Sequence, residues 1–137
     1  MTAIANSVGF LLAKAYQRAC AIYKEQFDKY ELTPQQFGLL RFLWEEDGIT
    51  QVELSNRSQI DRTTIGGLID RLEQSGLLQR LPHPDDRRAY RISLTARGKS
   101  LEAELTPLAE ELHRKILAPL SPEEIETLTA ILQKLRH

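Results

Sequence analysis

The sequence has few of the features that mark secreted or membrane proteins. Its 137 residues include a single cysteine, Cys20, which cannot form a disulfide within the chain. No apolar run approaches the roughly 20 residues of a membrane-spanning helix, and no stretch has the layout of a secretory signal. These absences predict a cytoplasmic chain with no membrane partner.

Motifs for catalysis and metal binding are also missing. The chain has no glycine-rich phosphate loop after a strand, no nucleophile elbow, and no histidine close to a candidate nucleophile. Its histidines lie in separate segments, with no close His or Cys pair that could begin a metal site: His83, His113 and His137. We therefore expect no enzyme, no metal and no cofactor.

Overall positive charge is absent, since 18 lysines and arginines face 19 acidic residues. Any attraction for nucleic acid must then come from local segregation of charge. Residues 57–91 contain seven arginines and five acidic residues, whereas residues 31–56 contain five acidic residues and Arg41 alone. The excess is modest, but it puts the positive charge in one part of the chain.

Helices account for most of what is present. A chain of this length can bury roughly two-thirds of its unfolded surface as one domain, without disulfide or metal support. Apolar residues at helical spacing predict helices over about 5–30, 34–47, 51–57, 62–75 and 96–118, and a final helix from Ser121. Thr33, Thr50 and Ser121 have the spacing of capping boxes, and Pro107 should kink or break the long fifth helix.

The chain is organised around the stretch from Ser58 to Leu94. Asp61 is a good N-cap for a helix whose apolar stripe is Ile65, Leu68, Ile69 and Leu72, and Gly76 is its expected stop. Strands are expected over 78–81 and 89–94, the second with Tyr90, Ile92 and Leu94 on one face. Between them, prolines and paired arginines predict a protruding hairpin tip.

A short helix over 51–57 precedes that helix, with Val52 and Leu54 as its apolar anchors. The two helices form a helix-turn-helix whose second helix would enter the major groove of DNA. The first and last helices have broad apolar faces with no obvious cover within the chain. We therefore expect the helices over 5–30 and 96–137 to intertwine across a two-fold axis in a homodimer.

Several segments together resemble the multiple-antibiotic-resistance regulator (MarR) family of winged helix-turn-helix transcription factors. They are Gly76-Leu77-Leu78 with Arg80, Asp85-Asp86-Arg87-Arg88, and Leu94-Thr95-Ala96-Arg97-Gly98. The resemblance implies one MarR-like domain over 1–137, mainly α-helical with a small β-hairpin wing. In it, 33–95 form the DNA-binding lobe, and 5–30 with 96–137 form the dimerisation region. It further implies a repressor that binds a palindromic operator in double-stranded DNA and releases it when a small molecule or an oxidant acts.

Candidate DNA contacts follow from the motif and the resemblance. Arginine can read guanine, and threonine can contact thymine or phosphate, at the exposed start of the recognition helix. The candidates on this helix are Arg62, Thr63 and Thr64 at its start, and Gly67 and Arg71 further along it. Arg71 could instead form a solvated ion pair with Asp70 or Glu73. Thr50, Arg57 and Ser58 are further candidates for contact with the DNA backbone.

Two features of this lobe leave alternatives open. Adjacent Gly66 and Gly67 inside a helix cost up to about 2 kcal/mol relative to alanine, which suggests close approach either to DNA or to the second helix. In the wing, the resemblance implies that one of Arg87 and Arg88 enters the minor groove, while Asp86 pairs with an arginine to fix the loop.

The resemblance places a small-molecule effector between the dimerisation helices and the DNA-binding lobe. Candidate lining residues are Tyr16, Cys20, Tyr23, Phe37, Arg41 and Trp44, although ordinary packing is the simpler role for most of them. An apolar pocket with a few polar groups would suit an aromatic acid or a phenol.

Two alternatives to this function remain. One branch of the family senses peroxide through a cysteine on its first helix, but Cys20 comes about two turns later, and Phe37 stands where that branch has a tyrosine. A packed, inert cysteine is therefore the favoured interpretation. The other alternative is a winged helix that contacts only proteins, which should lack exposed arginines at the helix start and wing tip.

Overall fold

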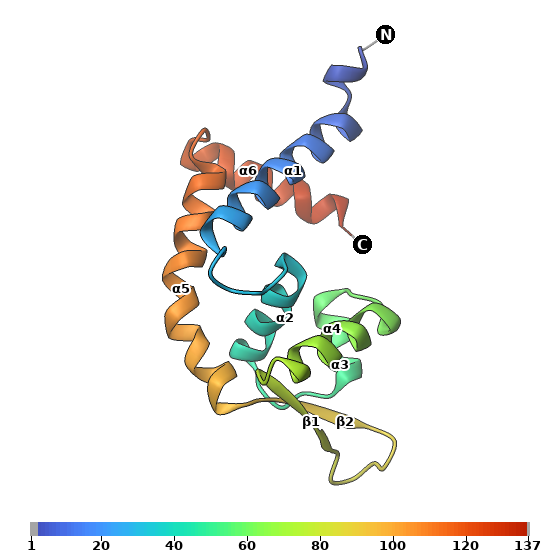
Figure 1. Cartoon of the computed structure of the whole chain (residues 1–137). Coiled ribbons are helices and arrows are strands. Elements are labelled where there is room, and N and C mark those ends of the chain that lie inside the picture. The colour runs from blue at the N-terminus through green and yellow to red at the C-terminus, as the bar shows by residue number, and fades with distance from the viewer. Residues whose placement is uncertain (1–2, 137) are drawn as a thin grey trace. The chain divides into compact units, whose positions relative to one another are not determined.

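The computed structural model describes residues 3–136, and over these it is mainly helical with one antiparallel hairpin (Figure 1). The elements are α1 (Val8–Gln26), α2 (Pro34–Glu45), α3 (Gln51–Ser58), α4 (Arg62–Gln74), β1 (Leu78–Pro82), β2 (Tyr90–Leu94), α5 (Ala96–Leu117) and α6 (Pro122–Leu135). A single 3-10 turn, Ile4–Asn6, precedes α1. The expected fold class is confirmed. His137 lies outside the described residues.

The chain divides into two compact units. We call Leu32–Thr106 the winged unit, and the described residues before Leu32 and from Pro107 onward the terminal unit. The helix α5 belongs to both, because it runs without interruption from Ala96 to Leu117. Pro107 therefore does not break the helix, which was one of the two outcomes expected for it.

The helix starts of the winged unit follow the capping rules. The Thr33 hydroxyl oxygen accepts from the Gln36 N–H at 3.1 Å, and the Gln36 side-chain oxygen accepts from the Thr33 N–H at 3.0 Å. The Thr50 hydroxyl likewise accepts from the N–H of Glu53 at 3.1 Å. These bonds satisfy backbone donors that a helix start leaves unpaired, which explains why the sequence located both helices well.

The core of the winged unit is formed by leucines and isoleucines from every one of its elements. Fully buried side chains include Leu39, Leu40 and Leu43 of α2, Leu54 of α3, Ile65, Ile69 and Leu72 of α4, Leu78 of β1, Ile92 of β2 and Leu105 of α5. The predicted apolar stripe of α4 is thus confirmed. Val52 was wrongly expected to be an apolar anchor of α3, since its side chain is 45% exposed. Of Val52 and Leu54, only Leu54 is buried in the core that α3 shares with α2 and α4.

The hairpin pairs Leu78 with Leu94 at its base and Pro82 with Tyr90 at its outer end. The strand β1 extends one residue beyond the expected 78–81, and β2 begins one residue later than the expected 89–94. Ile92 and Leu94 are buried, but Tyr90 is 49% exposed, because it lies at the outer end of the ladder, beyond the core. Tyr90 therefore follows the predicted alternation along β2, but it is not buried as Ile92 and Leu94 are.

The start of α5 is fixed against the end of α4. The Thr95 hydroxyl donates to the Gly76 carbonyl at 2.6 Å and accepts from the Gly98 N–H at 3.1 Å, so Thr95 caps α5. Gly98 lies so close to Leu77 that a Cβ at this position would be 2.0 Å from the Leu77 carbonyl oxygen. The Trp44 indole N–H donates to the Gly98 carbonyl at 2.9 Å. This corner therefore holds α2, α4 and α5 together.

In the terminal unit, α1 is shorter than predicted: it begins at Val8 and ends at Gln26 rather than near residue 30. Arg18 of α1 donates to the carbonyls of Lys115 at 3.0 Å and Ile116 at 2.8 Å, which lie at the unpaired end of α5. The helix α6 begins with the expected capping box of Ser121 and Glu124. Among the described residues, no helix is long and apolar enough to cross a membrane.

Candidate nucleic-acid interface

The first turn of α4 is ordered by its cap. The Asp61 carboxylate accepts from the backbone N–H of Thr64 at 2.8 Å and from the Thr64 hydroxyl at 2.8 Å. These two hydrogen bonds lower the pKa of Asp61 below its usual value. Arg62 and Thr63 are exposed beside the cap, whereas the Thr64 hydroxyl donates its hydrogen within it.

The two glycines of α4 have different surroundings. A Cβ at Gly66 would lie 3.7 Å from the side-chain nitrogen of Gln51 in α3, and a Cβ at Gly67 would meet nothing within 4 Å. Packing against α2 therefore does not explain either glycine. Close approach of this pair to DNA stays a prediction.

Arg80 on β1 binds along the side of α4, and the sequence did not reveal this role. Its guanidinium lies 2.6 Å from the Asp70 carboxylate, 3.1 Å from that of Glu73 and 3.2 Å from the Gly66 carbonyl oxygen. The sequence does contain a pattern that could have suggested it: Asp70 and Glu73 are three residues apart on α4, and an arginine follows shortly after the helix. Only the hairpin geometry shows that the three groups meet.

This arrangement bears on Arg71. The two carboxylates that could have paired with it along the helix are bound to Arg80 instead. Arg71 is exposed and forms no ion pair within the part of the chain that the structure describes. Its side chain is thus available to an anion outside the protein.

The wing loop, residues 83–89, extends away from the helices of its unit and is ordered by its own hydrogen bonds (Figure 1). The Asp86 carboxylate accepts from the Arg88 N–H at 2.9 Å, and the Arg88 Nε lies 4.0 Å from the same oxygen. The Arg88 side chain is 97% exposed, and Arg87 is exposed as well. Asp86 therefore orders the loop mainly through backbone, and leaves both guanidinium groups in solvent.

A hollow of about 330 Å³ separates the wing from the two helix starts. It is lined by Thr50, Gln51, Val52, Arg62, Arg80, Arg88, Ala89 and Tyr90. The surface between α4 and the wing is consequently concave and carries three arginines. This explains why Val52 and Tyr90 are exposed, although both have apolar spacing in the sequence.

The three further candidates for backbone contact lie on or beside α3. Thr50 forms an isolated bridge with Arg91. Arg57 pairs with Glu46 at 2.5 Å, on the surface. The Ser58 hydroxyl donates to the Ser55 carbonyl at 3.4 Å and accepts from the Ile60 N–H at 3.3 Å, within the helix-turn-helix turn.

The six candidate effector residues fall into two groups of three. In the winged unit, Phe37 and Trp44 meet edge to face with their ring centres 6.0 Å apart, and the Arg41 guanidinium is 5.7 Å from the Phe37 ring. The Trp44 N–H is already bound to Gly98, so it has a structural role. Arg41 is exposed.

In the terminal unit, Tyr16 and Cys20 are one helical turn apart on α1. A hydrogen bond between their side chains raises the pKa of Tyr16. Tyr23 stacks on Phe27 at a centroid distance of 4.5 Å, and burial raises its pKa to about 12. The hydroxyl beside Cys20 thus comes from the same helix, whereas the peroxide-sensing branch takes its tyrosine from the second helix.

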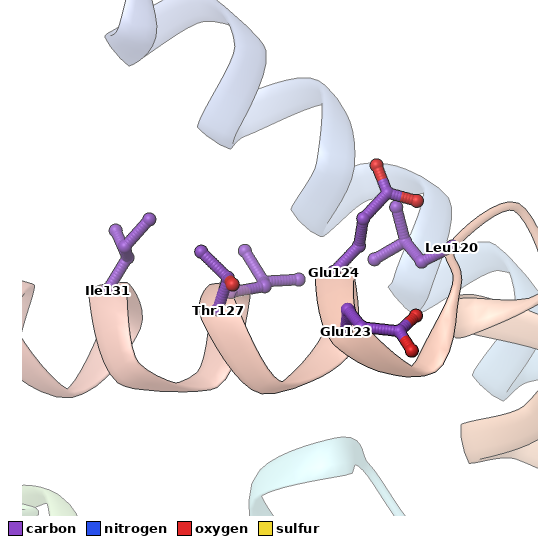
Figure 2. Close-up of a pocket in the computed structure, with 6 residues that line it drawn as sticks. Leu120, Glu123, Glu124, Thr127 and Ile131 are labelled. Atoms are coloured by element: carbon purple, nitrogen blue, oxygen red, sulfur yellow. The ribbon is translucent and has the colours of Figure 1, made fainter.

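The terminal unit also exposes large apolar side chains on two helices. On or before α1 these include Ile4, Val8, Leu11 and Leu12, and on α6 they are Ile131, Leu132 and Leu135. Figure 2 shows Glu124, Thr127 and Ile131 projecting from one side of α6, where they line a groove of about 400 Å³ together with Leu120, Glu123 and Leu128. None of the described residues of α6 is buried.

Comparison with known proteins connects these features to one family. Residues 32–90 match the profile of the MarR family. The chain is 33% identical over 132 residues to the HTH-type transcriptional repressor NicR of Pseudomonas putida, an alignment that covers 96% of this chain and 84% of NicR.

Two solved structures match nearly the whole chain. One is BpsR of Bordetella bronchiseptica, described with a mechanism for regulation of its DNA binding by 6-hydroxynicotinic acid. It has a TM-score of 0.91 and 32% identity, and the match covers 98% of this chain and 96% of BpsR. The other is a cysteine-to-serine mutant of MarR from Escherichia coli complexed with operator DNA. Its TM-score is 0.88 with 26% identity, covering 99% of this chain and all of that one.

Proposed function

Because this chain belongs to the MarR family, we propose that it is a homodimeric transcriptional repressor that binds operator DNA through α4 and the wing. The observation that carries the proposal is the distribution of its arginines. Arg62, Arg71 and Arg87 are exposed and form no ion pair among the described residues, and all three lie on α4 or the wing loop. Arg62 also lines the hollow between the helix starts and the wing. Exposed guanidinium groups without an ion pair are suited to the phosphates and base edges of a duplex.

Each element has its own role in this proposal. Arg62 and Thr63, at the exposed start of α4, would contact base edges in the major groove, the usual position of a recognition helix. Arg87 and Arg88 would reach the adjacent minor groove, where a narrow groove strengthens the negative potential. The bare backbone at Gly67 would let α4 approach the bases closely.

The apolar surface of the terminal unit supports a dimer. Its exposed leucines, isoleucines and valine lie on helices at both ends of the chain, and soluble monomers rarely expose large contiguous apolar patches. A two-fold dimer would present two copies of α4 and two wings. Such a protein would bind palindromic sites whose halves lie about one helical turn apart.

The test begins with selection of bound fragments from random or genomic DNA. Binding to the recovered duplex is then measured by fluorescence anisotropy across a series of salt concentrations. Arg87→Ala should weaken binding to every sequence and reduce the salt dependence by about two counterions per dimer, because each lost phosphate contact accounts for roughly 0.9. Arg97→Ala is the matched control, since it also removes one arginine from the winged unit, but from an ion pair with Glu104 on α5.

Equal effects of the two variants would contradict the proposed interface. Absence of any duplex binding by the wild-type protein at low ionic strength would contradict the function itself. That second result would favour the alternative of a winged helix that contacts only proteins.

We further propose that a small aromatic or phenolic acid releases the DNA. The support is the relative whose DNA binding is regulated by 6-hydroxynicotinic acid, together with Arg41, an exposed cation beside the Phe37 ring. A carboxylate on the ligand would match the Arg41 guanidinium. The test is titration of the DNA complex with 6-hydroxynicotinic acid and 4-hydroxybenzoic acid, using wild-type protein and Arg41→Gln. Release by peroxide alone, lost in Cys20→Ser, would instead identify a thiol sensor.

A further inference from the structure

Arg80 differs from Arg62, Arg71 and Arg87 because its guanidinium forms ion pairs and hydrogen bonds within the protein. Its side chain is only 21% exposed, and Nη1 lies between the carboxylates of Asp70 and Glu73. Nη2 donates to the Gly66 carbonyl at 3.2 Å, and Nε points to the Gln51 side-chain oxygen at 3.5 Å. With two acids already neutralising it, this guanidinium has little left to offer a phosphate.

The partners of Arg80 follow the length of the recognition helix. Gly66, Asp70 and Glu73 lie on successive turns of α4, and the Arg80 backbone N–H also donates to Glu73, at 3.1 Å. Arg80 itself stands in the middle of β1, the first strand of the wing, opposite Ile92. One side chain therefore joins the strand that supports the wing loop to the helix that would enter the major groove, and it reaches α3 through Gln51 as well.

Gly66 contributes to this link. Its carbonyl oxygen accepts from Arg80 Nη2, and a Cβ at this position would meet only the Gln51 side-chain nitrogen, 3.7 Å away, so the link uses the backbone of Gly66. A planar fork can bind a carbonyl and two carboxylates at once, whereas a lysine ammonium is a single point of charge. The geometry therefore depends on the shape of arginine and not only on its charge.

We propose that Arg80 is a positioning residue that fixes the wing relative to α4, so that it determines operator specificity without contacting DNA. The proposal rests on the proposed function. Specific binding requires the helix and the wing to occupy their two grooves simultaneously, and an error in either position loses base contacts. Non-specific binding depends on phosphate contacts alone, which tolerate such errors.

The experiment compares three full-length variants, Arg80→Lys, Arg80→Gln and Arg71→Gln, with the wild-type protein. Affinities for the selected operator and for a random duplex of equal length are measured against salt concentration, at a temperature where thermal unfolding shows each protein folded. Arg80→Lys retains the charge and loses the fork. Arg71→Gln is the matched control, because Arg71 is exposed on α4, the helix that Arg80 binds, and forms no ion pair among the described residues.

Arg80→Lys and Arg80→Gln should each reduce the ratio of operator to random affinity about tenfold, comparable to the cost of one mismatched base pair. Their binding to random duplex and their salt dependence should stay at the wild-type values. Arg71→Gln should weaken both duplexes alike and lower the salt dependence by about two counterions per dimer. Should Arg80→Gln fail to fold, Arg80→Lys alone decides the question.

Three results would overturn the proposal. Wild-type specificity in Arg80→Lys would mean that Arg80 acts only by neutralising Asp70 and Glu73. A lowered salt dependence of binding in the Arg80 variants would mean that Arg80 contacts a phosphate. Unchanged specificity in both Arg80→Lys and Arg80→Gln would mean that its contacts serve only the stability of the fold. All three presuppose that the wild-type protein binds the operator, so the failure of this inference is distinguishable from failure of the proposed function.

Discussion

Replacing Gly98 by alanine should destabilise the fold strongly, although alanine is the better helix former. The added Cβ would lie 2.0 Å from the Leu77 carbonyl oxygen, 3.0 Å from its carbon and 3.2 Å from a methyl group of Leu94. The Leu77 oxygen also accepts from the Thr95 N–H at 3.1 Å. Room for the methyl group therefore requires the backbone between α4 and β1 to move away from α5, which breaks that bond.

The expected size follows from three contributions. Overpacking a tight site costs about 1–3 kcal/mol, and loss of one hydrogen bond costs about 1 kcal/mol. Helix propensity returns at most about 1 kcal/mol. The net loss should be about 1–3 kcal/mol, which in a protein of this size corresponds to a fall in Tm of roughly 4–12 °C.

Gly67→Ala is the matched control for this prediction. It is the same substitution in a helix, but nothing lies within 4 Å of the added Cβ. Only the propensity gain applies, so stability should rise by about 0.5–1 kcal/mol. Both variants are compared with wild type by thermal unfolding at one protein concentration, because dimer formation makes Tm depend on concentration. A Gly98→Ala protein as stable as Gly67→Ala would refute the packing described for this corner.

Other substitutions test single features. Gly67→Ala, although stabilising, should weaken operator binding, and unchanged affinity in an anisotropy titration would exclude close approach of α4 there. Asp61→Ala should destabilise the protein at neutral pH. Because hydrogen bonds lower the pKa of Asp61, its carboxylate stabilises the fold above the usual carboxyl pKa, and this stabilisation is lost as pH falls through the lowered pKa. Denaturation curves of the variant and the wild type should therefore converge in acid. Trp44→Phe should lower the free energy of unfolding by about 1 kcal/mol, because it removes the hydrogen bond to Gly98; urea denaturation measures this. An unchanged free energy of unfolding would mean that this hydrogen bond does not stabilise the fold. Ile131→Lys should convert the dimer to monomer in sedimentation experiments, and a persistent dimer would place the interface elsewhere.

The sequence predicted helix starts and core positions better than it predicted exposure. Capping boxes and the stripe of α4 are local patterns, in which neighbouring residues provide both partners of each interaction, so Thr33, Asp61 and Ile65 could be assigned without a fold. Val52 was misjudged, and the exposure of Tyr90 was not predicted, because the surroundings of both residues depend on the hollow between α3 and the wing. That hollow exists only once β1 and β2 have paired.

The candidate interface shows the same division. Spacing and composition gave Arg62, Arg71, Arg87 and Arg88 as candidates, because arginines at a helix start, on the polar face of a helix and at a loop tip are visible in the sequence. They did not identify Arg80, whose role requires a strand to lie along α4 so that its side chain meets Asp70 and Glu73. Contacts between distant segments were therefore the part that sequence reasoning could not supply.

The central claim is that two copies of this chain bind one duplex through paired helices and wings. Sedimentation of the wild-type protein with the selected operator at low ionic strength measures this directly. The account predicts a complex of two chains per palindromic duplex, which dissociates as salt is raised. A protein that sediments as a monomer and leaves the DNA free would contradict it.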